Sequence, residues 1–96
     1  MMNQSRIIEK GICSPGRLRI IASLANPDGR PLSKYQLERR TGIRSSSLSS
    51  DLRKLQEIGW VLQIIESDRR ILFTLNKENE LLKRVLLFLD SVGYLR

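Results

Sequence analysis

Apolar residues recur at helical spacing over much of this chain, and clusters of turn-forming residues divide the pattern into short segments. Ser14 followed by Pro15 is typical of a helix N-terminus, and the apolar stripe that begins at Leu18 predicts a helix there. This helix should end at residues 26–29, a run of Asn, Pro, Asp and Gly. Before it, the pattern allows a short helix over residues 5–10.

Two further helices are predicted on either side of a glycine turn. Ser33 and Gln36 have the spacing of a capping box, in which each side chain accepts a hydrogen bond from the backbone of the other. The short helix that follows should end at Gly42, because glycine adopts the left-handed conformation at low cost. Another helix is predicted over residues 45–58. The leucines that form its inward face are Leu48, Leu52 and Leu55.

The period of the pattern changes after this helix. Residues 60–66 and 70–75 are rich in β-branched and aromatic side chains and are separated by a short polar turn, which is typical of an antiparallel hairpin. Asn76 is a favoured N-cap residue and predicts a last helix that runs to about Val92 and ends at Gly93. The predicted fold class is α+β, mainly α.

The run from Leu37 to Val61 contains a distinctive order of features. A leucine near the end of one helix is followed by the turn at Gly42 and by a serine-rich start to the next helix. A Leu-x-x-Leu pair then precedes a Gly-Trp-Val exit. This order resembles that of prokaryotic winged helix-turn-helix transcription regulators, archaeal ones included. The run Phe73-Thr74-Leu75-Asn76 is similar to the segment that closes the wing in such proteins.

The resemblance covers about residues 15–92 and implies a winged helix-turn-helix. Such a protein has a three-helix core, a two-stranded wing and, here, a C-terminal dimerisation helix. We expect a single domain over residues 1–96. Its parts are a winged helix core at residues 15–75, a C-terminal helix at residues 76–93 and an N-terminal extension at residues 1–13. The partner that the resemblance implies is double-stranded DNA, and the excess apolar surface of the last helix, described below, favours a homodimer.

The helix predicted over residues 45–58 has a polar face that suits a DNA groove. Ser46, Ser50, Arg53 and Glu57 fall opposite the leucines when each residue turns the helix by about 100°. Small hydroxyls let a helix approach the floor of a major groove, which is about 12 Å wide, and they can bind phosphates or base edges. Serine is a mediocre helix former, so five serines in residues 45–50 favour a binding role over a merely solvated face.

Positive charge is concentrated in the same part of the chain. The sequence has 17 Lys and Arg against 10 Asp and Glu, a net charge of +7. Residues 30–54 hold seven basic and two acidic residues and so account for +5 of it. Arg69 and Arg70 in the hairpin turn can reach a minor groove or its phosphates, or can simply lie in solvent. The predicted DNA-binding residues are Lys34, Arg39, Arg40, Arg44, Ser45, Ser46, Ser47, Ser49, Ser50, Arg53, Lys54, Arg69 and Arg70.

The last predicted helix has more apolar residues than one small domain can bury. Eight of the 12 residues at positions 81–92 are apolar, and they spread around most of the helix. The same helix of a second copy would cover the excess in a twofold dimer, although residues 1–12 could instead fold back over it. The predicted dimer-interface residues are Leu81, Leu82, Val85, Leu86, Phe88, Leu89 and Val92.

Several classes of function are excluded by what the sequence lacks. Without histidine there is no Ser-His-Asp or Cys-His catalysis, and Cys13 alone forms neither an internal disulfide nor a zinc site. The glycines are scattered rather than gathered in a phosphate-binding loop, and no pair of carboxylates stands out. We therefore expect no enzymatic activity and no cofactor, and we expect Cys13 to pack as a small apolar side chain.

The longest unbroken apolar run, Val85 to Leu89, is far too short to cross a bilayer. The first residues contain no apolar run that could act as a signal peptide, so a cytoplasmic location without membrane contact is expected. Two alternatives to a transcription regulator stay open on this fold. One is a sequence-tolerant chromatin or architectural DNA-binding protein, and the other is a winged helix module that binds another protein.

Overall fold

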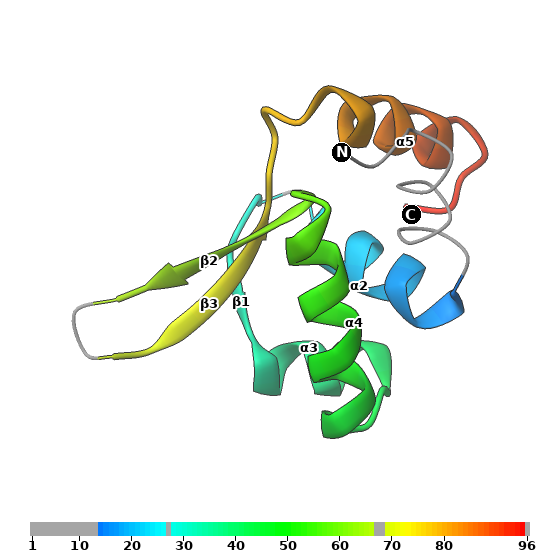
Figure 1. The fold of residues 1–96 in the computed structure, drawn as a ribbon. Coiled ribbons are helices and arrows are strands. Elements are labelled where there is room, and N and C mark those ends of the chain that lie inside the picture. The colour runs from blue at the N-terminus through cyan, green and yellow to red at the C-terminus, as the bar shows by residue number, and fades with distance from the viewer. Residues whose placement is uncertain (1–13, 27, 67–68, 96) are drawn as a thin grey trace.

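A computed structural model shows how these elements pack, and it describes residues 14–26, 28–66 and 69–95 (Figure 1). The short helix expected over residues 5–10 and the packing of Cys13 lie outside the described residues. The structure confirms the helices predicted from residue 15 onward and the antiparallel hairpin. The elements are α2 (Pro15–Leu24), β1 (Leu32–Ser33), α3 (Lys34–Thr41), α4 (Ser45–Glu57), β2 (Val61–Ile65), β3 (Ile71–Leu75) and α5 (Glu80–Ser91).

Local capping determines where α3 begins and ends. The backbone N–H of Gln36 donates to Ser33 Oγ at 3.2 Å, and the N–H of Ser33 donates to Gln36 Oε1 at 2.9 Å, which confirms the predicted capping box. At the other end, Gly42 has a φ of 72°, and its N–H donates to the carbonyl of Glu38. The chain therefore leaves α3 in a tight turn and enters α4 three residues later, at Ser45.

The sheet has three strands where the sequence predicted two. The antiparallel order is β1-β3-β2, with Leu32 paired to Phe73 and Ser33 paired to Leu72. A strand of two residues contains no alternation that a sequence pattern could reveal. Strand β1 ties the segment before α3 to the base of the β2–β3 ribbon, and this connection orients the ribbon relative to the helices.

The last helix begins later than the sequence predicted, because Asn76 does not cap it. The side chain of Asn76 donates to the carbonyl of Gly59 at 2.9 Å and accepts from the N–H of Glu78. The N-cap of α5 is Asn79, whose Oδ1 accepts from the N–H of Leu82 at 2.9 Å. Two asparagines thus satisfy backbone groups between the end of α4 and the start of α5.

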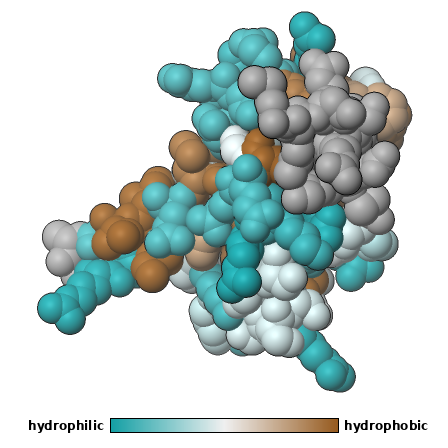
Figure 2. Space-filling view, in the orientation of Figure 1, coloured by the Kyte–Doolittle hydropathy of each residue, from teal (hydrophilic) through white to brown (hydrophobic). Residues whose placement is uncertain are grey.

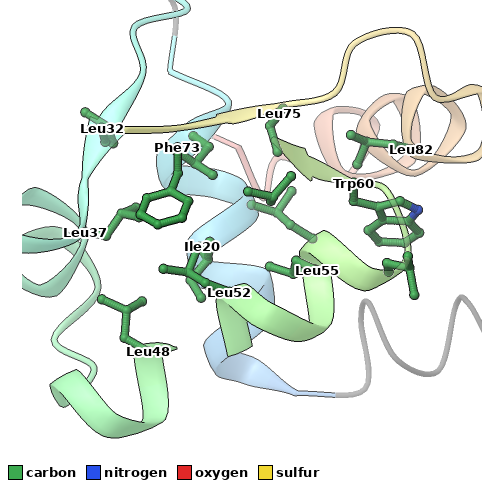
Figure 3. Packing of buried hydrophobic residues seen from close by; sticks show 14 of the residues in the cluster. Ile20, Leu32, Leu37, Leu48, Leu52, Leu55, Trp60, Phe73, Leu75 and Leu82 are labelled. Atoms are coloured by element: carbon green, nitrogen blue, oxygen red, sulfur yellow. The ribbon is translucent and has the colours of Figure 1, made fainter. Parts of the chain in front are cut away.

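One apolar core joins the helices to the sheet (Figure 3). Leu48, Leu52 and Leu55 are 0–2% exposed, which confirms the predicted inward face of α4. Figure 3 shows them gathered with Ile20 of α2 and Leu37 of α3 beneath the sheet. Burial of each of these leucine side chains stabilises the folded chain by about 1.5–3 kcal/mol relative to leaving it exposed. This packing holds α4 with its opposite face turned to solvent.

Candidate nucleic-acid interface

Helix α4 presents the polar face that its sequence predicts. Ser46, Ser50, Arg53 and Glu57 are all exposed, opposite the buried leucines. The N-cap residue Arg44 makes no side-chain capping bond to the first turn. Backbone N–H groups in a first turn that no side chain caps can bind an anion. The beginning of α4 thus combines backbone donors that the N-cap side chain does not cap with small hydroxyls.

A shallow hollow lies at this end of α4, and it has a volume of about 350 Å³. Its lining residues are Ser46, Ser47, Ser50 and Asp51. Asp51 is the acidic residue in this group, and its carboxylate is paired with Arg17 of α2. In Figure 2 the surface at the lower end of the molecule, where α4 begins, is pale and is surrounded by hydrophilic side chains.

The remaining predicted DNA-binding residues lie on α3, on α4 and at the turn of the β2–β3 ribbon. The exposed ones are Arg39, Arg40, Arg44, Ser45, Ser47, Arg69 and Arg70. The half-buried ones are Lys34, Ser49 and Lys54. Each of the three elements therefore presents at least one basic side chain to solvent, and the exposure that these predictions require is present.

Tyr35 is a residue of this surface that the sequence reasoning missed. It lies on α3, and its side chain is 65% exposed. Arg39 Nη1 donates to Tyr35 Oη at 3.2 Å, and the guanidinium carbon lies 5.9 Å from the ring centroid. The spacing of four residues, which places two side chains on one helix face, is the signal that could have revealed the pair. Because Tyr35 Oη accepts from Arg39, its own O–H is left to donate elsewhere.

The β2–β3 ribbon projects away from the helices (Figure 1). Its end is closed by two backbone bonds: the N–H of Glu66 donates to the carbonyl of Arg70, and the N–H of Arg69 donates to the carbonyl of Glu66. Arg69 has a φ of 66°, a left-handed conformation that is uncommon outside glycine. These bonds and the left-handed φ give the backbone of Arg69 a defined orientation near the far end of the ribbon.

The residues predicted for a dimer interface on α5 fall into two groups. Phe88 and Val92 are each 61% exposed and are available to a partner. Leu82 and Leu89 are 0% and 6% exposed within the chain's own core, which corrects their assignment to an interface. Leu87, which was not predicted, is 71% exposed. The half-buried residues that pack against the core are Leu81, Val85 and Leu86.

Within the described part of the chain, no three His, Cys, Asp or Glu residues come together as a group that could hold a metal ion. None of the helices described there is both long enough and apolar enough to cross a membrane.

The order of α2, α3, α4 and the β2–β3 ribbon defines a winged helix-turn-helix, in which α3 and α4 form the helix-turn-helix and the ribbon is the wing. Solved structures of transcription regulators share this fold. A structure described as that of a predicted DNA-binding transcriptional regulator from E. coli is 28% identical to the chain. It matches 93% of this chain and 88% of its own, with a TM-score of 0.73.

Two further structures are similar in fold. The transcriptional repressor BigR from Xylella fastidiosa is 22% identical, with a TM-score of 0.76, over 91% of this chain and 80% of BigR. A homodimeric winged helix-turn-helix DNA-binding domain from Mycobacterium bovis, described as a possible ArsR-family regulator, is also 22% identical. It matches 94% of this chain and 78% of its own, with a TM-score of 0.72. No family model and no curated protein sequence matches the chain.

Proposed function

We propose that this chain is a DNA-binding transcription regulator that places α4 in the major groove. The observation that carries the proposal is the exposed serine-rich face of α4, which begins at Arg44 and includes Arg53. The small hydroxyls allow close approach to the groove, and the two arginines are long enough for bidentate contact with guanine. The 28% identity to the E. coli regulator, over most of both chains, supports the same function.

Other basic residues have the role of positioning the protein on the DNA backbone. Lys34, Arg39 and Arg40 lie on α3, which precedes α4, and they would contact phosphates. The hydroxyl of Tyr35 and the guanidinium that it holds form a ready pair of donors for one phosphate group. Lys54 on α4 and the arginines of the wing would extend this contact along the duplex.

We further propose that the regulator is a dimer through the exposed apolar residues of α5. Leu87, Phe88 and Val92 are 61–71% exposed, and a second copy of the same helix can cover them in a twofold arrangement. The similar domain from Mycobacterium bovis is homodimeric. A dimer would present two α4 helices to half-sites about one turn of DNA apart, roughly 34–36 Å.

The proposal is tested by selecting DNA from a random-sequence pool with the purified protein. The selected duplex and an unselected one are then titrated at two salt concentrations. A regulator should bind the selected duplex at least roughly a thousandfold more tightly, and both affinities should fall as salt rises. Equal, salt-dependent binding to both duplexes would favour an architectural protein. A complete lack of binding would contradict DNA recognition and favour a protein-interaction module.

A further inference from the structure

The wing carries an exposed apolar pair close to its tip. Ile65 of β2 and Ile71 of β3 lie directly opposite each other and are 68% and 45% exposed. In Figure 2 the projecting ribbon shows a large hydrophobic area, with hydrophilic side chains toward its outer part. A contiguous apolar surface on a projecting element marks a contact with another molecule.

The face of the ribbon that holds this pair is the face turned toward α4. Successive side chains of a strand point to opposite faces, so Val61, Gln63 and Ile65 share one face of β2. Val61 is buried in the core, and Gln63 Oε1 accepts a hydrogen bond from Gln56 Nε2 of α4 at 3.4 Å. Ile65 is the next position outward on this face. The isoleucine pair therefore lies farther from the core than Gln63, on the face of the ribbon that contacts α4.

A duplex bound along α4 would bring a minor groove to this overhang. A five-residue strand is about 17 Å long. That length is half of the roughly 34 Å turn that separates equivalent grooves of DNA. A ribbon of this length can therefore span the distance from a major groove that α4 occupies to the neighbouring minor groove.

The charges of the wing turn are consistent with binding to a minor groove, but they would not by themselves bind it strongly. Arg69 and Arg70 are exposed, and arginine is the side chain that a narrow minor groove attracts. The turn also contains Glu66 and Asp68, so its formal charges balance. The acidic residues therefore offset part of the attraction of the two arginines to phosphates, and the isoleucine pair offers a further contact that salt does not screen.

We propose that Ile65 and Ile71 form a wedge that enters the minor groove, partly unstacks a base step and kinks the bound duplex. Apolar side chains inserted between base steps kink DNA by roughly 20–90°. Pyrimidine–purine steps are the easiest to unstack, so the bound site should carry such a step where the wedge enters. This inference rests on the proposed DNA binding through α4 and adds a bending activity to it.

Energy transfer between dyes at the two ends of the selected duplex measures this bend. At saturating wild-type protein, the energy transfer should correspond to a kink of roughly 20–90°. The variant Ile65→Thr/Ile71→Thr keeps β-branched side chains, which strands favour, and removes the apolar surface. It should lose most of the bend and still bind the selected duplex more tightly than the unselected one, through the contacts of α4. The matched control Leu62→Thr/Ile64→Thr changes the opposite face and should bend DNA like the wild type.

The outcomes separate this inference from the proposed function. Tight, specific binding without a bend would contradict the wedge but not the proposed transcription regulator. No DNA binding at all would contradict both proposals. Equal loss of the bend in both double variants would also overturn the assignment to this pair. An altered oligomeric state of the Ile65/Ile71 variant with an unchanged bend would show that the pair contacts a second copy instead. If the double variant does not fold, Ile65→Thr alone provides the same test at the more exposed position.

Discussion

Arg17 of α2 forms an ion pair with Asp51 of α4, in which Arg17 Nε lies 3.2 Å from Asp51 Oδ1. The two side chains are only 10% and 16% exposed. A Cβ atom on Gly16 would lie 2.8 Å from Asp51 Oδ2, so this glycine leaves the carboxylate the space that it occupies. The pair fixes α4 against α2 and neutralises an acidic charge on the helix that we propose binds DNA.

We expect Arg17→Met to lower the free energy of unfolding by about 2–4 kcal/mol, because it leaves a mostly buried carboxylate without its partner. Urea denaturation followed by circular dichroism measures this change. Asp51→Asn is the matched comparison and should be milder, because the amide oxygen can still accept from Arg17. An unchanged denaturation midpoint for Arg17→Met would show that the pair does not contribute to stability.

Arg53→Ala should weaken binding to the selected site by about 1–3 kcal/mol and relax the base preference at one position. This effect is expected because Arg53 is exposed on the face of α4 that we propose enters the major groove. Competition titrations with single-base variants of the site measure both effects. The control is Lys83→Ala, which removes a charge at an exposed position of α5 and should change neither the affinity nor the base preference. An equal loss on selected and random DNA would make Arg53 a phosphate contact.

Replacing Arg69 and Arg70 together by alanine should weaken binding to all sequences and lower the slope of log affinity against log salt by up to about two units. The control Lys83→Ala/Arg84→Ala removes the same charge from exposed positions on α5. A similar change in both double variants would indicate a general effect of net charge. An unchanged slope for the wing variant would show that the turn stays in solvent.

Tyr35→Phe should reduce affinity for selected and random DNA alike by about two- to tenfold, the effect of losing one hydrogen bond. The hydroxyl that holds Arg39 is removed while the ring remains. Stability should not change, because Tyr35 is 65% exposed. Tyr94→Phe, at another exposed tyrosine beyond α5, should leave DNA binding as it was. Unchanged binding by Tyr35→Phe would remove this pair from the interface.

Phe88→Glu should give a folded monomer, because this side chain is 61% exposed and a glutamate there disrupts only a contact between copies. Its DNA affinity should fall steeply, since two half-sites would no longer be bound as one linked unit. Leu89→Glu should unfold the chain, because Leu89 is 6% exposed. Analytical ultracentrifugation checks both variants. Sedimentation of the wild type as a monomer at tens of micromolar would contradict the dimer.

The features that could be predicted from the sequence are those with local causes. The capping box of Ser33 and Gln36 and the left-handed Gly42 involve neighbouring residues, so their spacing was enough to place α3. The inward leucines of α4 were found for the same reason. Asn76 and Asn79 are both good N-cap residues, and the side chains of both donate to the carbonyl of Gly59, which is remote in sequence. They differ in that Asn79 Oδ1 accepts from the first turn of α5 whereas Asn76 Oδ1 accepts from Glu78, a difference that residue type does not reveal. Strand β1 likewise exists only through its pairing with β3.

The candidate sites show the same division. The exposed face of α4 follows from helical period alone, because a single stripe of leucines defines the buried side. In α5 the apolar residues surround most of the helix, so period cannot distinguish the core from an interface. Leu82 and Leu89 are seven residues apart and share the buried face, whereas Phe88, one residue earlier than Leu89, points to solvent. Only the position of the other helices and the sheet determines which side is covered.

Trp60, the single tryptophan of the sequence, is fully buried and lies beside Leu82 of α5 in Figure 3. Its Nε1 has no hydrogen-bond partner among the described residues. Indole emission depends on the polarity of its surroundings, so unfolding should shift the fluorescence of this protein to the red. DNA held on the opposite, exposed face of α4 should leave that emission unchanged. The protein therefore contains its own optical reporter, which can distinguish a variant that does not fold from a folded variant that does not bind DNA.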